Sequence, residues 1–308
     1  MNVTIRPVDA AEHKLAIDLW LDVFGVEPEY FTRYYAGDPW YRPGDTLGAW
    51  VEGKLASTIH ICRRPMKWNG RIIMMAGIAN VATLPEYRGK CLATSLLKSL
   101  DEKLQTDDCD YAQLGTGIPE FYERLGWERL ALAQFQTTLD RTVPKASGVC
   151  EEVGHMHSVL PLYELSARPL LPVRTEEYML GWVSYERNKL DSYTWVIPEC
   201  GYIMVRLPGE IGRTAEVSEW IAVDSDTEEL LFRQALAAAQ THGAANLCFA
   251  AMPEFINPAF IGSLAGIVTY DPEPGAMIKN IRLPDDDYTA IKAALNSGQA
   301  PCWIADHY

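Results

Sequence analysis

The sequence predicts an α+β fold made of two tandem copies of one domain. At 308 residues, the chain is long enough for two domains of ordinary size. In each half, runs with the two-residue period of strands alternate with runs that have the 3.6-residue period of helices. After a polar connector at 141–152, the order of these runs repeats. We therefore divide the chain into two domains, residues 1–145 and residues 146–308.

The first half begins with a strand and two helices, the second of them rich in aromatic residues. Three strands follow, and the pairs Glu52-Gly53 and Asn69-Gly70 between them favour hairpin turns. A helix with a leucine-rich face, a strand, a short helix and a strand region complete the half. The predicted elements are 3–8, 11–24, 28–36, 46–51, 55–67, 72–83, 89–105, 111–115, 119–125 and 128–139.

The second half repeats this order with two helices, three strands, a long helix, a strand, a short helix and a strand. One further helix and an apolar tail at 299–308 close the chain. The predicted elements are 155–167, 175–185, 193–197, 202–207, 215–223, 227–242, 246–251, 258–264, 276–283 and 286–296.

The net charge of −14 is divided unevenly between the halves. Residues 1–150 contain 17 basic and 19 acidic side chains, whereas residues 151–308 contain 10 and 22. Such a balance argues against nucleic acid as a partner, because binding to a phosphate backbone needs a basic surface. It is compatible with a cationic partner, although an acidic surface often serves only solubility.

The seven cysteines are scattered and include no CxxC pair, which argues against a disulfide framework and against a metal site. The first residues lack the apolar core of a signal peptide. The longest apolar stretch, 72–82, is well short of the roughly 20 residues that span a bilayer. We therefore expect a reduced, cytoplasmic protein that does not bind membranes.

The stretch 80–93 has the features of an anion-binding turn. A strand is expected to end near Thr83 and a helix to begin near Gly89. The first N–H groups of a helix have no partner and carry positive potential, so they can bind a phosphate. Arg88 and Lys90 add positive charge at the same place. An ordinary strand–turn–helix connection would look the same on local grounds alone.

Two motifs in the first half resemble a known family. The run Pro85-Glu86-Tyr87-Arg88-Gly89-Lys90-Cys91-Leu92-Ala93 resembles motif A of the GNAT superfamily of acyl-CoA N-acyltransferases. The stretch 111–127, with Phe121-Tyr122-Glu123-Arg124-Leu125-Gly126-Trp127, resembles its motif B. The resemblance covers residues 1–140 and implies that each copy has a mixed central sheet flanked by helices. Cys91 stands where the family pattern usually has the middle glycine.

By this resemblance the cosubstrate is acetyl-CoA and the chain is an enzyme, an N-acetyltransferase. Its pantetheine arm would pair with the backbone of the strand before the turn. Its diphosphate would bind N–H groups of the turn. The residues implied are Asn80, Val81, Ala82, Thr83, Arg88, Gly89, Lys90, Cys91, Leu92 and Ala93.

Transfer to an amine needs a base for the ammonium and an acid for the departing thiolate. Family members commonly place a tyrosine acid in motif B, which points to Tyr122. The strand before motif A, 77–81, has no carboxylate, so a water or another group must act as the base. The second candidate catalytic residue is Tyr308, through its terminal carboxylate.

The tail 301–308 is apolar and aromatic, which is unusual for a free terminus and indicates that it docks. In tandem-GNAT acetyltransferases of the enhanced-intracellular-survival type, the terminal carboxylate reaches the first domain's active site. The present chain resembles these proteins, but 308 residues leave no room for their sterol-carrier-like domain. A tail that merely seals a domain interface is the alternative.

The acceptor would be a small cationic amine or a basic peptide. Aromatic faces and carboxylates in and after the second helix could attract an ammonium group. The candidate substrate residues are Glu29, Tyr30, Tyr34, Asp38 and Trp40, each of which could equally belong to the core. The sequence leaves homo-oligomer formation open.

The second copy lacks the motif A turn, because the acidic stretch 224–229 stands in its place. We expect Ser225 and Glu228 to form a capping box there, so that the helix satisfies its own N–H groups. This predicts a degenerate copy that does not bind CoA. It disfavours a mycothiol-synthase-like enzyme, whose second copy is the working one. A non-catalytic CoA-binding regulatory module is a further alternative.

Overall fold

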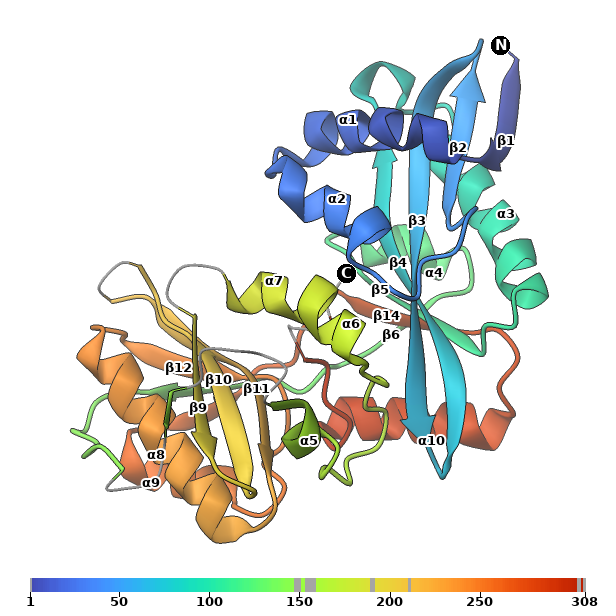
Figure 1. Cartoon of the computed structure of the whole chain (residues 1–308). Coiled ribbons are helices and arrows are strands. Elements are labelled where there is room, and N and C mark those ends of the chain that lie inside the picture. Colours follow the sequence, from blue (N-terminus) through green and yellow to red (C-terminus); the bar gives the residue numbers. More distant parts are fainter. Residues whose placement is uncertain are drawn as a thin grey trace. The chain divides into compact units, whose positions relative to one another are not determined.

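The computed structural model describes residues 2–146, 151–152, 159–188, 192–209, 212–303 and 306. These residues form two compact units (Figure 1). Unit 1 contains the residues up to 130 together with 275–288, and unit 2 contains 131–274 together with 289–307. This division differs from the single boundary expected near residue 145, because each half of the sequence supplies one strand to the other unit.

Unit 1 is built on a seven-stranded mixed sheet in the order β1-β2-β3-β4-β5-β14-β6. The pair β4·β5 is parallel and every other neighbouring pair is antiparallel. The strands are β1 Val3–Pro7, β2 Thr46–Val51, β3 Lys54–Trp68, β4 Arg71–Thr83, β5 Tyr111–Gly115, β6 Glu128–Arg129 and β14 Ala276–Asn280.

Helices cover both faces of this sheet. On one face, Trp20 of α1 donates its indole N–H to Thr58 of β3 at 2.8 Å and packs against Phe31 of α2. On the other face, the leucines of α3 pack with Ile59 and Ile61 of β3 in the main hydrophobic core. The helices are η1 Ala10–Glu12, α1 His13–Phe24, α2 Pro28–Ala36, η2 Pro85–Tyr87, α3 Leu92–Thr106 and α4 Pro119–Glu123.

Unit 2 repeats the same plan in the order β8-β9-β10-β11-β12-β7-β13, again with one parallel pair, β11·β12. Position by position, each strand corresponds to one of unit 1, so the prediction of two copies of one α+β fold is confirmed. The strands are β7 Phe135–Thr138, β8 Glu151–Glu152, β9 Ser192–Ile197, β10 Gly201–Arg206, β11 Thr214–Ala222, β12 Asn246–Phe249 and β13 Val268–Tyr270.

The helices of unit 2 include the long α8, which packs Phe232 against Trp220 of β11 and Phe249 of β12. They are α5 Leu160–Tyr163, α6 Glu176–Tyr178, the π-helix η4 Met179–Val183, α7 Ser184–Arg187, α8 Ser225–Thr241 and α9 Pro258–Leu264. The last helix, α10 Asp285–Ser297, begins in unit 1 and continues in unit 2. No helix in the described ranges is long and apolar enough to cross a membrane.

The sixth strand of each sheet comes from the other half of the sequence. The predicted strand region 128–139 consists of two short strands, of which β6 lies in unit 1 and β7 lies in unit 2. In return, β14 pairs with β5 from Ala276↔Gly115 to Asn280↔Tyr111 and fills the place between β5 and β6. The two halves therefore exchange equivalent strands.

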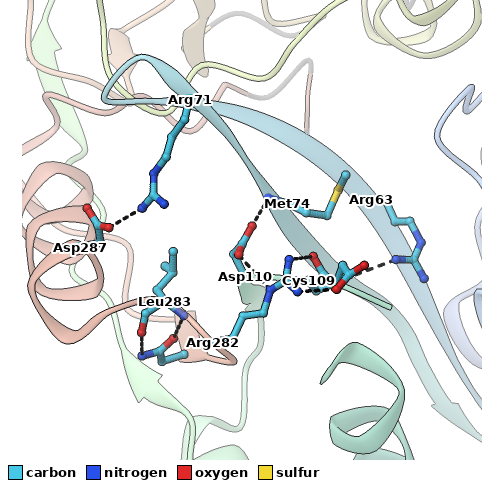
Figure 2. Close-up of polar contacts among 10 residues, drawn as sticks. Arg63, Arg71, Met74, Cys109, Asp110, Arg282, Leu283 and Asp287 are labelled. Carbon is cyan, nitrogen blue, oxygen red and sulfur yellow. Dashed lines mark hydrogen bonds and ion pairs between the residues drawn. The ribbon is translucent and has the colours of Figure 1, made fainter. Parts of the chain in front are cut away.

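Polar contacts fix the segment after β14 to unit 1 (Figure 2). The backbone N–H groups of Ile281 and Arg282 both donate to the carbonyl of Asp110. The Arg282 guanidinium pairs with the carboxylates of Asp108 and Asp110, and Asp110 also accepts from the N–H of Met74 at 2.7 Å. At the start of α10, Asp287 pairs with Arg71.

Several predicted boundaries shift in the structure. The helix expected at 89–105 begins at Leu92, because Gly89 and Cys91 have positive φ angles. The helix expected at 155–167 is represented by the short α5, and residues 155–158 of that prediction lie outside the described part. The strand β13 was missed because it is three residues long and half-exposed.

Candidate functional site

The parallel strands β4 and β5 separate partway along their length. They pair at Met75↔Tyr111, Ala76↔Ala112 and Gly77↔Gln113. Both strands continue beyond this point, β4 to Thr83 and β5 to Gly115, without a further bridge between them among the described residues. The backbone groups along this edge of β4 are therefore available to an extended ligand, as at the open edge of any sheet.

A β-bulge distorts β4 on the open stretch. The register with β3 changes between Thr58↔Ala82 and His60↔Ala79, which leaves Asn80 and Val81 opposite Ile59 alone. Asn80 has a φ of 51°, in the left-handed region that asparagine tolerates better than most residues. A bulge increases the local twist and bends the strand, which turns the end of β4 away from β5.

The turn between β4 and α3 leaves the start of that helix open. Gly89 has a φ of 75° and Cys91, at the N-cap, has a φ of 59°. No side chain caps the helix, and the N–H groups of Leu92, Ala93 and Thr94 have no acceptor within the part of the chain that the structure describes. Unpaired N–H groups at a helix N-terminus form an anion-binding site.

Two cations flank the open turn. Arg88 donates its Nε to the carbonyl of Thr83 at 3.2 Å, and Lys90 donates its Nζ to the carbonyl of Glu86 at 3.1 Å. Both side chains are exposed, and the Glu86 carboxylate is bound to Lys54 at 3.0 Å. The positive charges of Arg88 and Lys90 therefore remain available beside the α3 N-terminus.

A cavity of about 500 Å³ joins these features. Eight of the ten residues predicted to hold the cosubstrate line it, and two predicted residues, Asn80 and Ala82, do not. The wall opposite the turn is apolar and comes from α1, α4 and the residue before α4. The cavity is lined by Val23, Val81, Thr83, Tyr87, Arg88, Gly89, Lys90, Cys91, Leu92, Ala93, Thr94, Ile118, Phe121 and Tyr122.

Tyr122 brings a hydroxyl group to this cavity from a side chain that is otherwise buried. Its side chain is 6% exposed and packs edge-on against Phe121 and Trp127. Burial raises the pKa of Tyr122 to about 12. The hydroxyl has no hydrogen-bond partner among the described residues. A protonated, unsatisfied phenol is suited to donate a hydrogen bond or a proton to a bound group.

Residues 4–130 match the family model described as "Acetyltransferase (GNAT) domain". They form a GNAT acetyltransferase domain. The motifs at 85–93 and 121–127 both lie within this match. No curated protein sequence gives a significant match to the chain.

Several solved structures share the fold of almost the whole chain. A probable N-acyltransferase from Enterococcus faecalis superimposes with a TM-score of 0.70 at 17% identity, covering 92% of this chain and 74% of that one. A GCN5-related N-acetyltransferase from Anabaena variabilis gives 0.67 at 17% identity, with 91% and 73% covered. Eis1 from Mycobacterium abscessus gives 0.64 at 17% identity, with 91% and 74% covered. The likeness in fold to these structures therefore extends over both units.

The residues predicted to contact the acceptor of the GNAT domain are not brought together as an open surface. Tyr34 is fully buried against Trp20, and the Asp38 carboxylate forms a buried ion pair with Arg64 at 2.7 Å. These two predictions are corrected, because both side chains belong to the core of unit 1. Glu29 is exposed, and Tyr30 and Trp40 are half-buried. None of the five lines the cavity.

Sequence reasoning missed the apolar part of the cavity. Val23 lies near the end of α1, and Ile118, 60% exposed, directly precedes α4. Val23 stands in no motif, and the helical periodicity of α1 marks it only as one of several apolar positions. Ile118 lies within the motif B stretch 111–127 but outside its most characteristic part, 121–127. An isolated isoleucine after Gly115-Thr116-Gly117 was the one available signal for Ile118.

The expectation that His60 is structural agrees with its surroundings. It is 1% exposed, and its Nδ1 is 2.8 Å from the Thr46 hydroxyl. Burial lowers the pKa of His60 to about 3, so it is neutral at physiological pH. It lies among the rings of Trp20, Tyr34 and Tyr35.

The tail docks on unit 2 as far as the structure describes it. Trp303 is 1% exposed and packs on Trp220 at 4.8 Å between ring centroids. Asp306 accepts from Arg174 at 2.7 Å and from the Tyr178 hydroxyl at 3.1 Å. The predicted catalytic residue Tyr308 lies outside the described residues.

The second GNAT-like copy has no room for the anion-binding turn. Eight residues, 84–91, separate β4 from α3, whereas two, 223–224, separate β11 from α8. The N-cap of α8 is Asp224, which accepts from Thr227 N–H at 2.8 Å. The predicted capping box of Ser225 and Glu228 is wrong. Glu228 is instead buried and accepts the N–H groups of Glu254, Phe255 and Ile256.

Proposed function

We propose that the chain transfers an acetyl group from acetyl-CoA to a primary amine at the cavity of unit 1. One observation carries the proposal, namely that a single cavity combines the uncapped start of α3, two available cations and the unsatisfied Tyr122 hydroxyl. An open strand edge, a phosphate-binding turn and a proton donor are the three elements that acyl transfer from a CoA thioester requires.

The residues of unit 1 fit acetyl-CoA. The N–H groups of residues 89–93, with the side chains of Arg88 and Lys90, would hold the diphosphate, and the open edge of β4 at 80–83 would hold the pantetheine amides. Gly89, Gly115 and Gly117 have open space where a side chain would stand, which leaves room for a ligand backbone. Bound acetyl-CoA supplies an activated thioester.

Tyr122 would act as the general acid. Its raised pKa keeps the phenol protonated at neutral pH, and its hydroxyl has no competing acceptor in the described part of the chain. A donor at this place would protonate the departing thiolate as the amide bond forms by direct attack of the amine.

The reaction also needs a base that accepts the proton of the ammonium group. The bulged stretch of β4 contains Asn80 but no carboxylate, and Asn80 Nδ2 is buried without a partner among the described residues. An amide there can orient a water that accepts the ammonium proton. The terminal carboxylate of Tyr308 is the alternative base. The acceptor itself would be a small cationic amine or a lysine-like side chain.

Thiol release from acetyl-CoA tests the proposal. The purified chain should release CoA in the presence of at least one member of a panel of polyamines, aminoglycosides and basic peptides. If no amine of the panel raises thiol release above the background while CoA still binds, the proposed reaction is refuted. That result would favour a non-catalytic CoA-binding module.

Matched variants test the location of the cosubstrate. Arg88→Glu reverses one of the two available charges and should weaken CoA binding by about 100-fold or more, because it loses a charge-assisted contact and adds repulsion. Ser225→Ala, at the corresponding helix start of unit 2, should leave CoA binding unchanged. Equal losses in both variants would contradict a single site in unit 1.

A further inference from the structure

Cys91 differs from the other described cysteines in its surroundings. It is exposed, whereas Cys62 and Cys109 are buried and Cys200, Cys248 and Cys302 are half-buried. It is the N-cap of α3 and lines the cavity of unit 1. A small molecule that enters this cavity from solvent therefore meets the Cys91 thiol directly.

The charges around Cys91 are positive. Arg88 precedes it by three residues and Lys90 by one, and both line the same cavity. Both side chains donate to backbone carbonyls. Neither forms an ion pair with a carboxylate in the described ranges, so both positive charges remain uncompensated there. The open N–H groups of Leu92, Ala93 and Thr94 add the partial positive charge of a helix N-terminus.

A second feature independently marks this cavity as a ligand site. The Tyr122 side chain is more than nine-tenths buried, lines the cavity and has no hydrogen-bond partner for its hydroxyl among the described residues. The hydroxyl oxygen itself is open to the cavity and can donate a hydrogen bond to a bound group. The cavity that contains Cys91 therefore offers a bound group a hydrogen-bond donor as well as two cations.

We propose that Cys91 is a modification site that forms a mixed disulfide with small anionic disulfides, and that the attached group excludes the cosubstrate from unit 1. The positive surroundings select an anionic reagent over a cationic one. The exclusion rests on the proposed function, because it requires that CoA occupies the same turn. The formation of the adduct does not rest on it.

The chemistry is a thiol–disulfide exchange. The Cys91 sulfur, as a thiolate, attacks one sulfur of the anionic disulfide. One S–S bond forms to Cys91 while the original S–S bond breaks. The second half leaves as a thiolate and takes up a proton, so the disulfide is the oxidant and no further reagent is needed. A dithiol reverses the exchange.

The position of the adduct explains its effect. The Cys91 side chain projects from the N-cap, next to the unpaired N–H groups that would hold the diphosphate. An attached anionic group satisfies the same donors and cations intramolecularly. CoA would then have to compete with a covalently held anion at high effective concentration.

Oxidised glutathione, which is anionic, and cystamine, which is cationic, form a matched pair of probes. We expect oxidised glutathione to modify the full-length chain at Cys91 about ten times faster than cystamine at low ionic strength, because of the local charge. The ratio should fall toward one in 1 M salt, where the Debye length is about 3 Å. Intact mass and peptide mapping follow the reaction, and Cys91→Ser should show no adduct at this peptide.

CoA binding to the modified protein completes the test. The glutathione adduct should weaken CoA binding at least about 100-fold, as an anion occupying the site does, and dithiothreitol should restore it. Modification at another cysteine, equal rates for the two probes, or unimpaired CoA binding by the Cys91 adduct would each overturn the inference. If the reduced, unmodified protein does not bind CoA, the proposed function is wrong. The adduct then cannot act by excluding CoA from unit 1.

Discussion

The replacement of Tyr122 by phenylalanine separates a catalytic role of this residue from a structural one. The substitution removes a single oxygen atom. The ring stays in contact with Phe121, 5.0 Å away between ring centroids, and with Trp127, 6.2 Å away. The hydroxyl gives up no hydrogen bond with a described residue, so the free protein loses no polar contact there.

The expected magnitudes follow from this geometry. The Tyr122 hydroxyl is open to the cavity and has no partner among the described residues, so Tyr122→Phe should change the free energy of unfolding by less than about 0.5 kcal/mol. Loss of a general acid typically lowers the rate by 10²–10⁴-fold, and we expect a fall in kcat of about 100-fold. Affinity for CoA should change by less than about threefold, because the phosphate-binding turn is untouched.

The assay combines three measurements on one preparation. Thiol release gives kcat, equilibrium titration gives the CoA affinity, and denaturant unfolding gives stability. Because the pKa of Tyr122 is about 12, the acid stays protonated, and the ratio of wild-type to variant kcat should be constant between pH 7 and pH 10. Tyr270→Phe, at an exposed tyrosine of unit 2, serves as the control and should leave kcat and CoA affinity unchanged. The Tyr270 hydroxyl donates to the Asn296 carbonyl at 3.4 Å, so only a small loss of stability is expected there.

A variant with full kcat would refute the acid role of Tyr122. A fall in kcat accompanied by an equal loss of stability would show that the hydroxyl supports the fold. A fall in CoA affinity with unchanged kcat would assign the hydroxyl to binding of the cosubstrate.

Three further predictions concern stability. Cys91→Gly should stabilise the chain by about 0.5–1 kcal/mol in denaturant unfolding, because Cys91 has a φ of 59° that glycine adopts without strain; a loss of stability would contradict this. Because burial lowers the pKa of His60 to about 3, the unfolded chain takes up a proton below about pH 6.5 that the folded chain does not. Through this group, the free energy of unfolding should therefore fall by about 1.4 kcal/mol per pH unit from pH 6 to pH 4, and His60→Asn should flatten that slope. If the free energy of unfolding of the variant and the wild-type chain falls equally with pH, the assignment to His60 is wrong. Asp306→Asn leaves Arg174 with one carboxylate, that of Glu219, and should lower the free energy of unfolding by about 2 kcal/mol. The control Asp226→Asn, at an exposed position, should leave the free energy of unfolding almost unchanged.

The anion-binding turn could be predicted from the sequence because only neighbouring residues form it. A strand, a few small or basic residues and a helix follow one another within 14 residues, and no distant contact decides their geometry. The left-handed conformation of Cys91 was not accessible, since the family pattern and the helical spacing both placed the helix start near Gly89. The positive φ angles of Gly89 and Cys91 delay the helix to Leu92.

The aromatic residues of α2 show the limit of residue type as a guide to function. Phe31 and Tyr34 are three positions apart and lie on one face of the helix, as core residues of an amphipathic helix do. The structure buries this face against Trp20. Asp38 looked like a ligand for a cationic substrate, but the cation it binds is Arg64 within the same unit.

The exchange of β7 and β14 could not be predicted from sequence, because both strands satisfy the same local pattern in either sheet. A strand's alternation of apolar and polar residues tells which face is buried but not which sheet it joins. Here the two sheets have equivalent vacancies, between β5 and β6 and between β12 and β13. Pairing between strands more than 100 residues apart decides which sheet each strand joins. The periodicity of a single strand carries no information about such a partner.

The exchange also gives a physical reason for the presence of a second copy without its own anion-binding turn. In the described part of the chain, β6 pairs with β14 and with no other strand, and β5 has β14 on its whole second edge. Without residues 276–280, β5 would carry unpaired N–H and C=O groups along its second edge, which is costly for a buried strand. Unit 1 therefore needs the strand that the second half supplies, whether or not that half binds an anion itself. Residues 276–280 complete the sheet of unit 1 although none of them lines the cavity.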